Sequence, residues 1–160
     1  MIKVGDKVPS VKVKVAAETG GGEETTTEAL FANKRVVLFG VPGAFTPTCS
    51  AKHLPGYVER AGELKAKGVD MIACVSVNDA FVMAAWARDQ KAFGKVTMIA
   101  DGNADFAKAL GVELDLVGAN MGMRNQRYAA VIENGVVTAF ALEAPGKFEV
   151  SSAEAIAGSL

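Results

Sequence analysis

Cysteine and histidine are scarce in this sequence, and long apolar runs are absent. The 160 residues include two cysteines and one histidine. Two cysteines are too few for a disulfide framework, so each thiol needs its own explanation. No stretch is long and apolar enough to span a bilayer, and the start "MIKVGDKVPS" lacks the apolar segment of a signal peptide. We therefore expect no membrane association and a cytoplasmic location.

The sequence also lacks an excess of charge of either sign. Its formal net charge is -1 and its pI is about 5.9, with lysines and arginines scattered along the chain. Proteins that bind nucleic acid or anionic membranes carry clustered positive charge. The sequence therefore excludes a nucleic-acid partner and favours a small, roughly neutral substrate.

Apolar residues, in contrast, make up half of the chain. Because two independent domains would be cramped at this length, we predict a single domain over residues 1–160. Hydrophobic periodicity predicts strands at residues 10–15, 35–41, 69–77 and 95–101, and a hairpin over 127–143 with Asn134-Gly135 at its turn. It predicts helices at residues 25–33, 57–68, 78–90, 104–111 and 151–158, the last with Ser151 and Glu154 at the spacing of a capping box.

This order of elements predicts an α/β fold. Parallel strands joined by right-handed crossovers would form a central mixed β-sheet with an antiparallel edge and flanking helices. Such sheets carry their sites at the carboxyl ends of the strands. The loop "GVPGAFTPTCS", residues 40–50, follows the buried strand at 35–41 and lies at such an end.

The residues of this loop predict a helix that presents a thiol at its start. Pro47 suits the first turn of a helix, which makes Thr46 the N-cap and Cys49 the third helical residue. The unpaired N–H groups and the positive end of the helix dipole favour a thiolate there over a thiol. A thiolate is nucleophilic, so Cys49 is the candidate reactive residue.

Cys74 and His53 have simpler explanations. Cys74 lies within the apolar strand "MIACVSV", where a free cysteine usually acts as a small hydrophobic residue. His53 follows Cys49 by four residues and could form a Cys-His nucleophilic pair on one helix face. We expect Pro55 to break that helix soon afterwards, which favours a role for His53 in shaping the loop.

At this point the sequence resembles the peroxiredoxins. Pro42, Thr46 and Cys49 stand in the family's P-x-x-x-T-x-x-C pattern. The segment "FGVPGAFTPTCSxxHLPG" is similar to the corresponding segment of the type II, peroxiredoxin-five-like subfamily. The likeness extends over "VGDKVP", "GVDMIACVSVNDAFVMAAWA" and "RNQRYAAVIENGVV". The resemblance implies a thioredoxin fold and a thiol peroxidase that reduces hydrogen peroxide and alkyl hydroperoxides. Cys49 would become a sulfenic acid.

The resemblance also implies roles for the neighbours of Cys49. Arg127, by its position in "QRYAAVIENG", would hold the thiolate and a peroxide oxygen with its guanidinium. The Thr46 hydroxyl would bond to the reacting atoms, the N–H groups of Thr48 and Cys49 would complete the donors, and Pro42 would shield the thiolate from water. No prosthetic cofactor and no metal are expected. Arg124 is the next candidate if Arg127 is misplaced.

The remaining expectations concern partners. No cysteine follows Cys74, so a built-in disulfide is not expected, and glutathione with glutaredoxin, or thioredoxin, would recycle Cys49 from outside. Phe45 beside the site, together with Phe81, predicts the interface of a homodimer, to which the resemblance also points.

Two other classes of function stay open at this stage. A cysteine hydrolase would use Cys49 with His53 as its base. A binding or chaperone module with the thioredoxin fold would need no reactive thiol.

Overall fold

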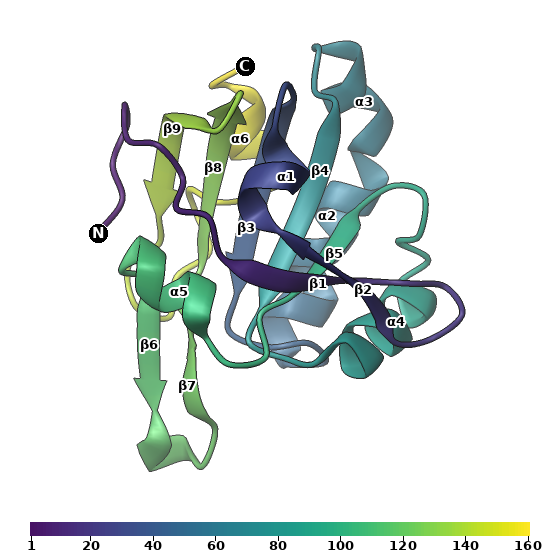
Figure 1. The fold of residues 1–160 in the computed structure, drawn as a ribbon, viewed down its shortest axis with the longest axis vertical. Helices are drawn as coiled ribbons and strands as arrows, with labels where there is room; N and C mark the ends of the chain where they lie inside the picture. The colour runs from purple at the N-terminus through teal and green to yellow at the C-terminus, as the bar shows by residue number, and fades with distance from the viewer.

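A seven-stranded mixed sheet runs through the middle of the computed structural model, which describes residues 1–160 (Figure 1). In spatial order its strands are β2 (Gly22–Thr26), β1 (Lys12–Ala16), β5 (Thr97–Ala100), β4 (Met71–Ser76), β3 (Arg35–Val41), β8 (Tyr128–Glu133) and β9 (Val136–Leu142). The three central strands β3, β4 and β5 are parallel, whereas β1 and β8 pair with them antiparallel. The carboxyl ends of the central strands therefore meet at one edge.

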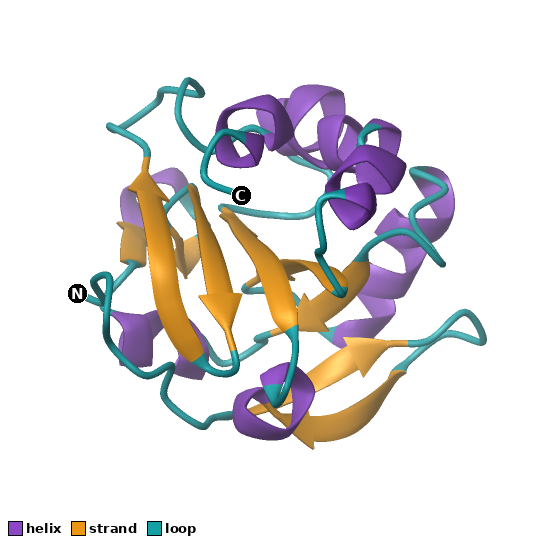
Figure 2. Ribbon diagram, turned by 90° about the horizontal axis from the view of Figure 1, so that it is seen from above, coloured by secondary structure: helices purple, strands orange, loops and turns teal.

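Helices cover both faces of the sheet (Figures 1 and 2). One face carries α2 (Leu54–Glu59), α3 (Ala61–Ala66), α4 (Ala80–Asp89) and α6 (Ala153–Ala157), and the other carries α1 (Thr27–Phe31) and α5 (Asp105–Leu110). A mixed sheet between two helical layers confirms the predicted α/β class.

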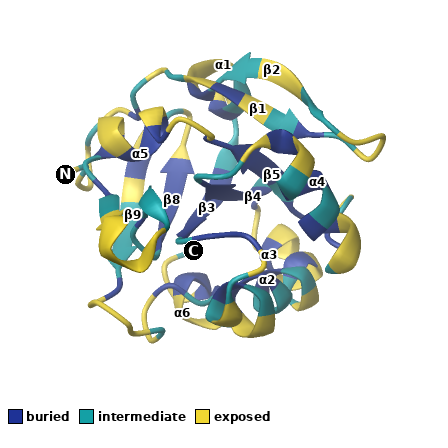
Figure 3. Cartoon of the chain, turned by 90° about the horizontal axis from the view of Figure 1, so that it is seen from below, coloured by how far each residue is buried: buried dark blue, intermediate teal, exposed yellow.

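Strand β3 is buried on both faces, as its unbroken apolar sequence predicts. Val37 and Phe39 pack into the core cluster on the side of α2, whereas Val36 and Leu38 pack into the cluster on the side of α1. Figure 3 shows β3, β4 and β8 in the colour of buried residues between the two helical layers. The strand that leads into the candidate loop is therefore held firmly.

Gly40, near the end of β3, lets the neighbouring strand approach closely. Its register partner on β8 is Tyr128, and a Cβ on Gly40 would lie 2.2 Å from a carbon of the buried tyrosine ring. The ring thus fills the space of the missing side chain. This packing holds the start of β8, directly after Arg127, against β3.

Three short strands are not anticipated by the sequence pattern. Residues 22–26 form β2 where a loop and the start of a helix are expected, and the helix α1 begins only at Thr27. Strand β2 pairs with β1, and the Lys12 Nζ atom lies 2.7 Å from the Glu24 carboxylate. β6 (Glu113–Leu116) and β7 (Gly122–Asn125) form a separate two-stranded sheet. Such polar or very short strands are stabilised by the strands that they pair with, so they form without a clear hydrophobic period in their own sequence.

The expected capping box at the last helix is shifted by one residue. The hydroxyl of Ser152, not that of Ser151, accepts a hydrogen bond from the Ala155 N–H at 3.1 Å. Ser151 instead donates its hydroxyl to the Glu143 carboxylate at 2.6 Å. The buried carboxylate therefore competes with the helix end for this serine.

The helix that begins at Pro47 continues through Pro55, so the predicted break is wrong. A π-helical turn, η1 (Cys49–His53), leads directly into α2. Pro55 lacks the N–H that would reach Ser50, five residues earlier, and the Ser50 carbonyl accepts from Gln90 Nε2 at 3.2 Å instead. Trp86 Nε1 also donates to the Ser50 hydroxyl at 3.0 Å. The side chain of Gln90, at the end of α4, thus replaces the lost helical bond.

No helix in the structure combines the length and the apolar character that crossing a membrane requires.

Candidate active site at the carboxyl end of β3

The loop after β3 is fixed by hydrogen bonds before the helix begins. The Thr46 hydroxyl donates to the Gly43 carbonyl at 2.6 Å, and the Ala44 N–H donates to Asn78 Oδ1 at 2.9 Å. A Cβ on Gly43 would lie 2.7 Å from a guanidinium nitrogen of Arg124, which occupies that space. Because Asn78 follows β4, the loop lies where the carboxyl ends of β3 and β4 meet, as predicted.

Cys49 is the third residue of the helix, as the loop sequence predicts, and it is fully buried. The first helical N–H to pair with a carbonyl is that of Ser50, which donates to Thr46 at 3.0 Å. The N–H groups of Thr48 and Cys49 donate to no group of the protein. Free N–H groups at the start of a helix stabilise negative charge, so this position suits a thiolate or an oxyanion.

Arg127 reaches Cys49 from the other side of the loop, although 78 residues separate them in the sequence. Its Nη2 atom donates to the Cys49 sulfur at 3.1 Å. Its guanidinium carbon lies over the Phe148 ring, 5.9 Å from the ring centre, in the arrangement of a cation–π contact. A permanent positive charge therefore contacts the sulfur.

His53 binds the arginine and not the thiol. Its Nε2 atom lies 3.0 Å from the Ser151 carbonyl, and its Nδ1 atom lies 2.8 Å from Arg127 Nη1. A carbonyl only accepts, so Nε2 carries the hydrogen, and the bare Nδ1 accepts from the guanidinium. Burial, and next the charge of Arg127, lower the pKa of His53 from 6.5 to about 3. His53 is therefore neutral near pH 7.

This geometry removes the basis of a Cys-His hydrolase. Both ring nitrogens of His53 already have hydrogen-bond partners, Ser151 and Arg127, and neither nitrogen forms a hydrogen bond with the sulfur of Cys49. A histidine with a pKa of about 3 is also a weak base near neutral pH.

Pro42, Thr46 and Arg124 surround the pair without binding the sulfur. Arg124 donates through Nη1 to the Pro42 carbonyl at 3.3 Å and through Nε to the Met121 carbonyl at 2.9 Å. It therefore anchors the loop backbone, while Arg127 contacts Cys49. The Thr46 hydroxyl hydrogen is directed to Gly43, so the hydroxyl offers its lone pairs and does not cap the helix as predicted.

Cys74 belongs to the same core cluster as Cys49. Both cysteines are free and fully buried. Burial, and next the neighbouring Cys49, raise the pKa of the Cys74 thiol well above its ordinary value. Cys74 is therefore a protonated core residue at neutral pH, consistent with its apolar sequence context.

A cavity of about 290 Å³ borders Arg127. Its wall includes Arg127, Thr48 and Pro42 beside the site, and Leu114 and Leu116 from β6. The cavity therefore joins a charged end at Arg127 to an apolar wall.

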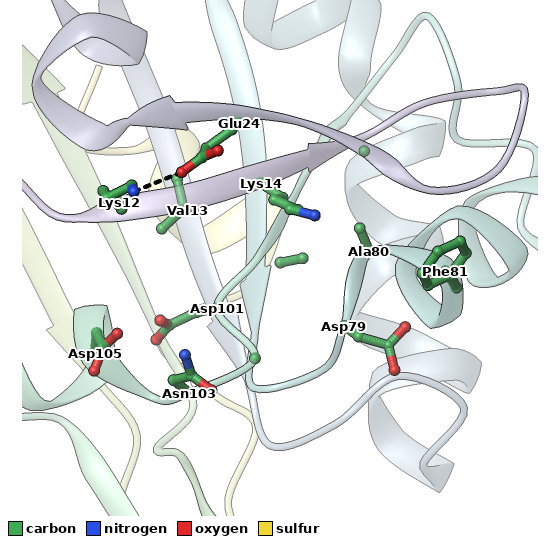
Figure 4. Close-up of a pocket in the computed structure, with 13 residues that line it drawn as sticks. Lys12, Val13, Lys14, Glu24, Asp79, Ala80, Phe81, Asp101, Asn103 and Asp105 are labelled. Atoms are coloured by element: carbon green, nitrogen blue, oxygen red, sulfur yellow. Dashed lines mark ion pairs between the residues drawn. The ribbon is translucent and has the colours of Figure 1, made fainter.

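A larger cavity of about 460 Å³ lies elsewhere, between the β1–β2 hairpin and the loops before α4 and α5 (Figure 4). Four of its charged groups already have partners within the protein. Lys12 pairs with Glu24, Asp79 accepts from the Val82 N–H, and Asp101 accepts from two N–H groups of α5. It holds no cysteine or histidine, and no cluster of side chains suited to a metal ion occurs in the structure.

Four residues near the site carry no signal in the sequence pattern. Tyr57 donates its hydroxyl to the Ser151 carbonyl at 2.8 Å, and Phe148 packs against His53 with ring centres 4.9 Å apart. Ser151 and Glu143 complete the surroundings. Only the spacing between Cys49 and His53 could have pointed to the histidine, and it suggested a base.

The sequence matches the family model described as Redoxin over residues 3–156. It is 50% identical over 156 residues to Peroxiredoxin-2E, chloroplastic, of Arabidopsis thaliana, across 96% of this chain and 67% of that protein. It is 52% identical over 158 residues to Peroxiredoxin-2E-2, chloroplastic, of Oryza sativa subsp. japonica, across 96% of this chain and 70% of that protein. The chain is a type II peroxiredoxin of the redoxin family.

A solved structure agrees with this assignment. The reduced Prx3 of Vibrio vulnificus, in complex with H2O2, superposes on this peroxiredoxin with a TM-score of 0.94 and 53% identity over all of both chains. The peroxiredoxin therefore has the thioredoxin fold and is a thiol-dependent peroxidase, as the motif around Cys49 predicts.

The predicted cytoplasmic location is contradicted by these comparisons. Both plant relatives named above are chloroplastic proteins. A compartment is addressed by targeting segments that are separate from the folded domain, so the composition of the peroxiredoxin domain does not specify it.

Proposed function

We propose that Cys49 is the residue of this peroxiredoxin that reacts with peroxide, within one catalytic domain over residues 1–160. The observation that carries the proposal is the 3.1 Å contact between the Cys49 sulfur and Arg127 Nη2, beside two unpaired N–H groups. The thiolate attacks one peroxide oxygen, a sulfur–oxygen bond forms and the O–O bond breaks. The departing oxygen takes up a proton and leaves as water or an alcohol, and Cys49 becomes a sulfenic acid.

The neighbours of Cys49 stabilise the charge as it moves from sulfur to oxygen. Arg127 donates to the sulfur and, with its remaining N–H groups, to a peroxide oxygen. The N–H groups of Thr48 and Cys49 are further fixed donors. Thr46 accepts through its hydroxyl oxygen, and Pro42, which has no N–H, limits the access of water.

The substrates that we propose are hydrogen peroxide and alkyl hydroperoxides. The cavity beside Arg127 is large enough for a short alkyl group, and Leu114 and Leu116 give it an apolar wall. The Vibrio vulnificus relative binds H2O2. The alkyl group of such a substrate would pack against Leu116 and add binding energy that hydrogen peroxide cannot gain.

Rates with hydrogen peroxide and with a branched alkyl hydroperoxide test this proposal. In Leu116→Lys, kcat/KM for the alkyl hydroperoxide should fall about 10-fold, as expected for the loss of ~1–2 kcal/mol of apolar contact. The rate with hydrogen peroxide should stay within about two-fold, since it makes no such contact. Equal effects on both substrates would remove this cavity from the proposal.

We further propose that the enzyme uses one cysteine and an external thiol. Cys74 is fully buried, and no cysteine follows it. An external thiol condenses with the sulfenic acid to give a mixed disulfide and water, and a second thiol then releases Cys49 as a thiol. Glutathione with glutaredoxin, or thioredoxin, supplies these thiols.

Peroxide consumption with each reductant in turn tests this part. Sustained turnover with glutathione and glutaredoxin, or with thioredoxin, is the expected result. If the reaction stops after one turnover with both systems, although free dithiothreitol sustains it, neither reductant serves this enzyme.

The partner that we propose on the surface is a second copy of the chain. Phe45 and Phe81 expose 53% and 71% of their surface, and Phe45 has a φ of +61°. An aromatic residue in the left-handed region is strained, and such strain tends to be retained where it serves function. A homodimer would bury both rings beside the active sites.

A further inference from the structure

Glu143 is a buried carboxylate that follows β9 and receives hydrogen bonds from one short segment, residues 149–151. The N–H groups of Glu149, Val150 and Ser151 all donate to it, at 2.8 to 2.9 Å. The Ser151 hydroxyl donates at 2.6 Å. Successive N–H groups that converge on one anion form a rigid cradle, so this carboxylate determines where the backbone of residues 149–151 lies.

The same segment holds the neutral histidine. The carbonyl of Ser151 accepts from His53 Nε2 at 3.0 Å and from the Tyr57 hydroxyl at 2.8 Å. This carbonyl requires the hydrogen of His53 to be on Nε2, which leaves Nδ1 bare. If the hydrogen moved to Nδ1, it would face the N–H of Arg127, two donors would oppose each other, and the guanidinium would lose its anchor.

Glu143 also binds the backbone of Arg127 directly. Its own N–H donates to the Arg127 carbonyl at 3.0 Å. A closed ring of hydrogen bonds therefore leads from Glu143 to residues 149–151, to His53, to the guanidinium of Arg127 and back through the Arg127 backbone. Arg127 Nη2, outside this ring, is left to contact Cys49.

We infer that Glu143 is a positioning residue for the peroxidase reaction, because it holds the Ser151 carbonyl that selects the tautomer of His53 and thereby aims Arg127 at Cys49. This inference rests on the proposed function of Cys49 and Arg127. Glu143 does not bind the sulfur. It lines the cavity proposed for an alkyl group, so its effect is measured with hydrogen peroxide, which carries no such group. Burial raises the pKa of Glu143, but its hydrogen bonds from Ser151, Glu149 and Val150 outweigh burial and lower it, which keeps the carboxylate charged.

The single histidine of the chain makes the experiment direct. In ¹⁵N-histidine-labelled protein at pH 7, the nitrogen shifts and their proton couplings report which ring nitrogen carries the hydrogen. Wild type should show Nε2–H and a bare Nδ1. Glu143→Gln is nearly isosteric, but its amide NH₂ opposes the N–H groups of residues 149–151, so it should show a mixture of tautomers. Its kcat/KM for hydrogen peroxide should fall about 10-fold to 100-fold, less than the loss of a direct donor.

Glu149→Gln is the matched control. It removes a carboxylate from the same segment, but the Glu149 side chain is exposed and makes no hydrogen bond. It should leave both the histidine spectrum and the rate at wild-type values. If Glu143→Gln does not fold, Ser151→Ala removes only the 2.6 Å hydroxyl bond and should change the spectrum and the rate in the same direction, by less.

The outcomes separate this inference from the proposed function. An unchanged histidine spectrum in the folded Glu143→Gln or Ser151→Ala protein would overturn the inference, whatever the rate. If Glu149→Gln changes the spectrum as much as Glu143→Gln, the segment and not Glu143 sets the tautomer, and the inference also fails. Peroxidase activity that persists in Cys49→Ser would instead overturn the proposed function.

Discussion

Arg127 and His53 meet through Nη1 and Nδ1 at 2.8 Å, so the only histidine in the chain accepts a hydrogen bond from the arginine that contacts Cys49. A neutral histidine in this place binds the guanidinium through a hydrogen bond and does not neutralise its positive charge. The position four residues after Cys49 therefore serves the orientation of Arg127, and not the removal of a proton from the thiol.

The first prediction concerns the thiol itself. Cys49→Ser should abolish peroxidase activity and keep the fold, because a serine hydroxyl stays protonated where a thiol ionises. Peroxide consumption above the background of free thiols would contradict the assignment. Circular dichroism and denaturant unfolding would check that the loss is not a loss of structure.

The second prediction concerns Arg127. Arg127→Lys keeps the charge but loses the planar fork whose two ends bind His53 and the sulfur, so the rate constant with peroxide should fall by about 10-fold to 1,000-fold. Stopped-flow measurement of Cys49 oxidation gives this constant directly. In Arg124→Lys, where only the bonds to the Pro42 and Met121 carbonyls change, the fall should be smaller. The reverse order would exchange the roles of the two arginines.

The third prediction concerns stability at acid pH. The folded-state pKa of His53 is about 3, below the 6.5 expected when the chain is unfolded. Between these values the unfolded state binds the extra proton, so the free energy of unfolding falls as pH falls from 6.5 towards 3, by up to about 1.4 kcal/mol per pH unit.

His53→Gln is the test of that slope. Glutamine keeps one donor and one acceptor at the end of the side chain but does not titrate. Urea unfolding between pH 6.5 and 5 should show a smaller slope in this variant than in wild type. The window avoids Glu143, whose lowered pKa affects stability only in more acid solution. Equal slopes would mean that His53 is not buried in its neutral form.

The fourth prediction concerns Cys74. Cys74→Ser should keep most of its peroxidase activity with an external thiol reductant, and lose about 1–3 kcal/mol of stability from a hydroxyl in an apolar strand. Mass spectrometry after one equivalent of peroxide should find sulfenic acid or a thiol adduct on Cys49 in both proteins. A rapid Cys49–Cys74 disulfide in wild type, with loss of turnover in the variant, would identify Cys74 as a resolving thiol.

The fifth prediction concerns the homodimer. Phe45→Asp should shift the sedimentation profile towards monomer, and aspartate tolerates the positive φ at this position better than phenylalanine does. Val117→Asp is the control, since Val117 is an equally apolar, exposed residue on η2 (Val117–Ala119) between β6 and β7. An unaltered dimer in Phe45→Asp, or a monomeric wild type, would refute the proposed interface.

Elements with a strong local pattern could be predicted from the sequence, and those without one could not. The parallel strands β3 and β4 have unbroken apolar runs, and Asn134-Gly135 has the two positive φ angles of a hairpin turn. In contrast, β2 is polar and is ordered by its pairing with β1. The helix continues through Pro55, and Gln90, from the end of another helix, donates to the Ser50 carbonyl that the proline leaves without a helical N–H.

For the candidate site, the sequence by itself determined the placement of Cys49 at the third position of a helix, because Pro47 has the backbone angle of a first helical residue and Cys49 follows it by two residues. The family resemblance pointed to Arg127, whose contact with the sulfur the structure shows, but tertiary structure alone decided that His53 supports the arginine. It also decided that Glu143 holds the segment beside them. The physical reason is that each of these contacts depends on distant segments meeting at one point, where short distances, burial and the direction of each donor select one partner among several of the same chemical type.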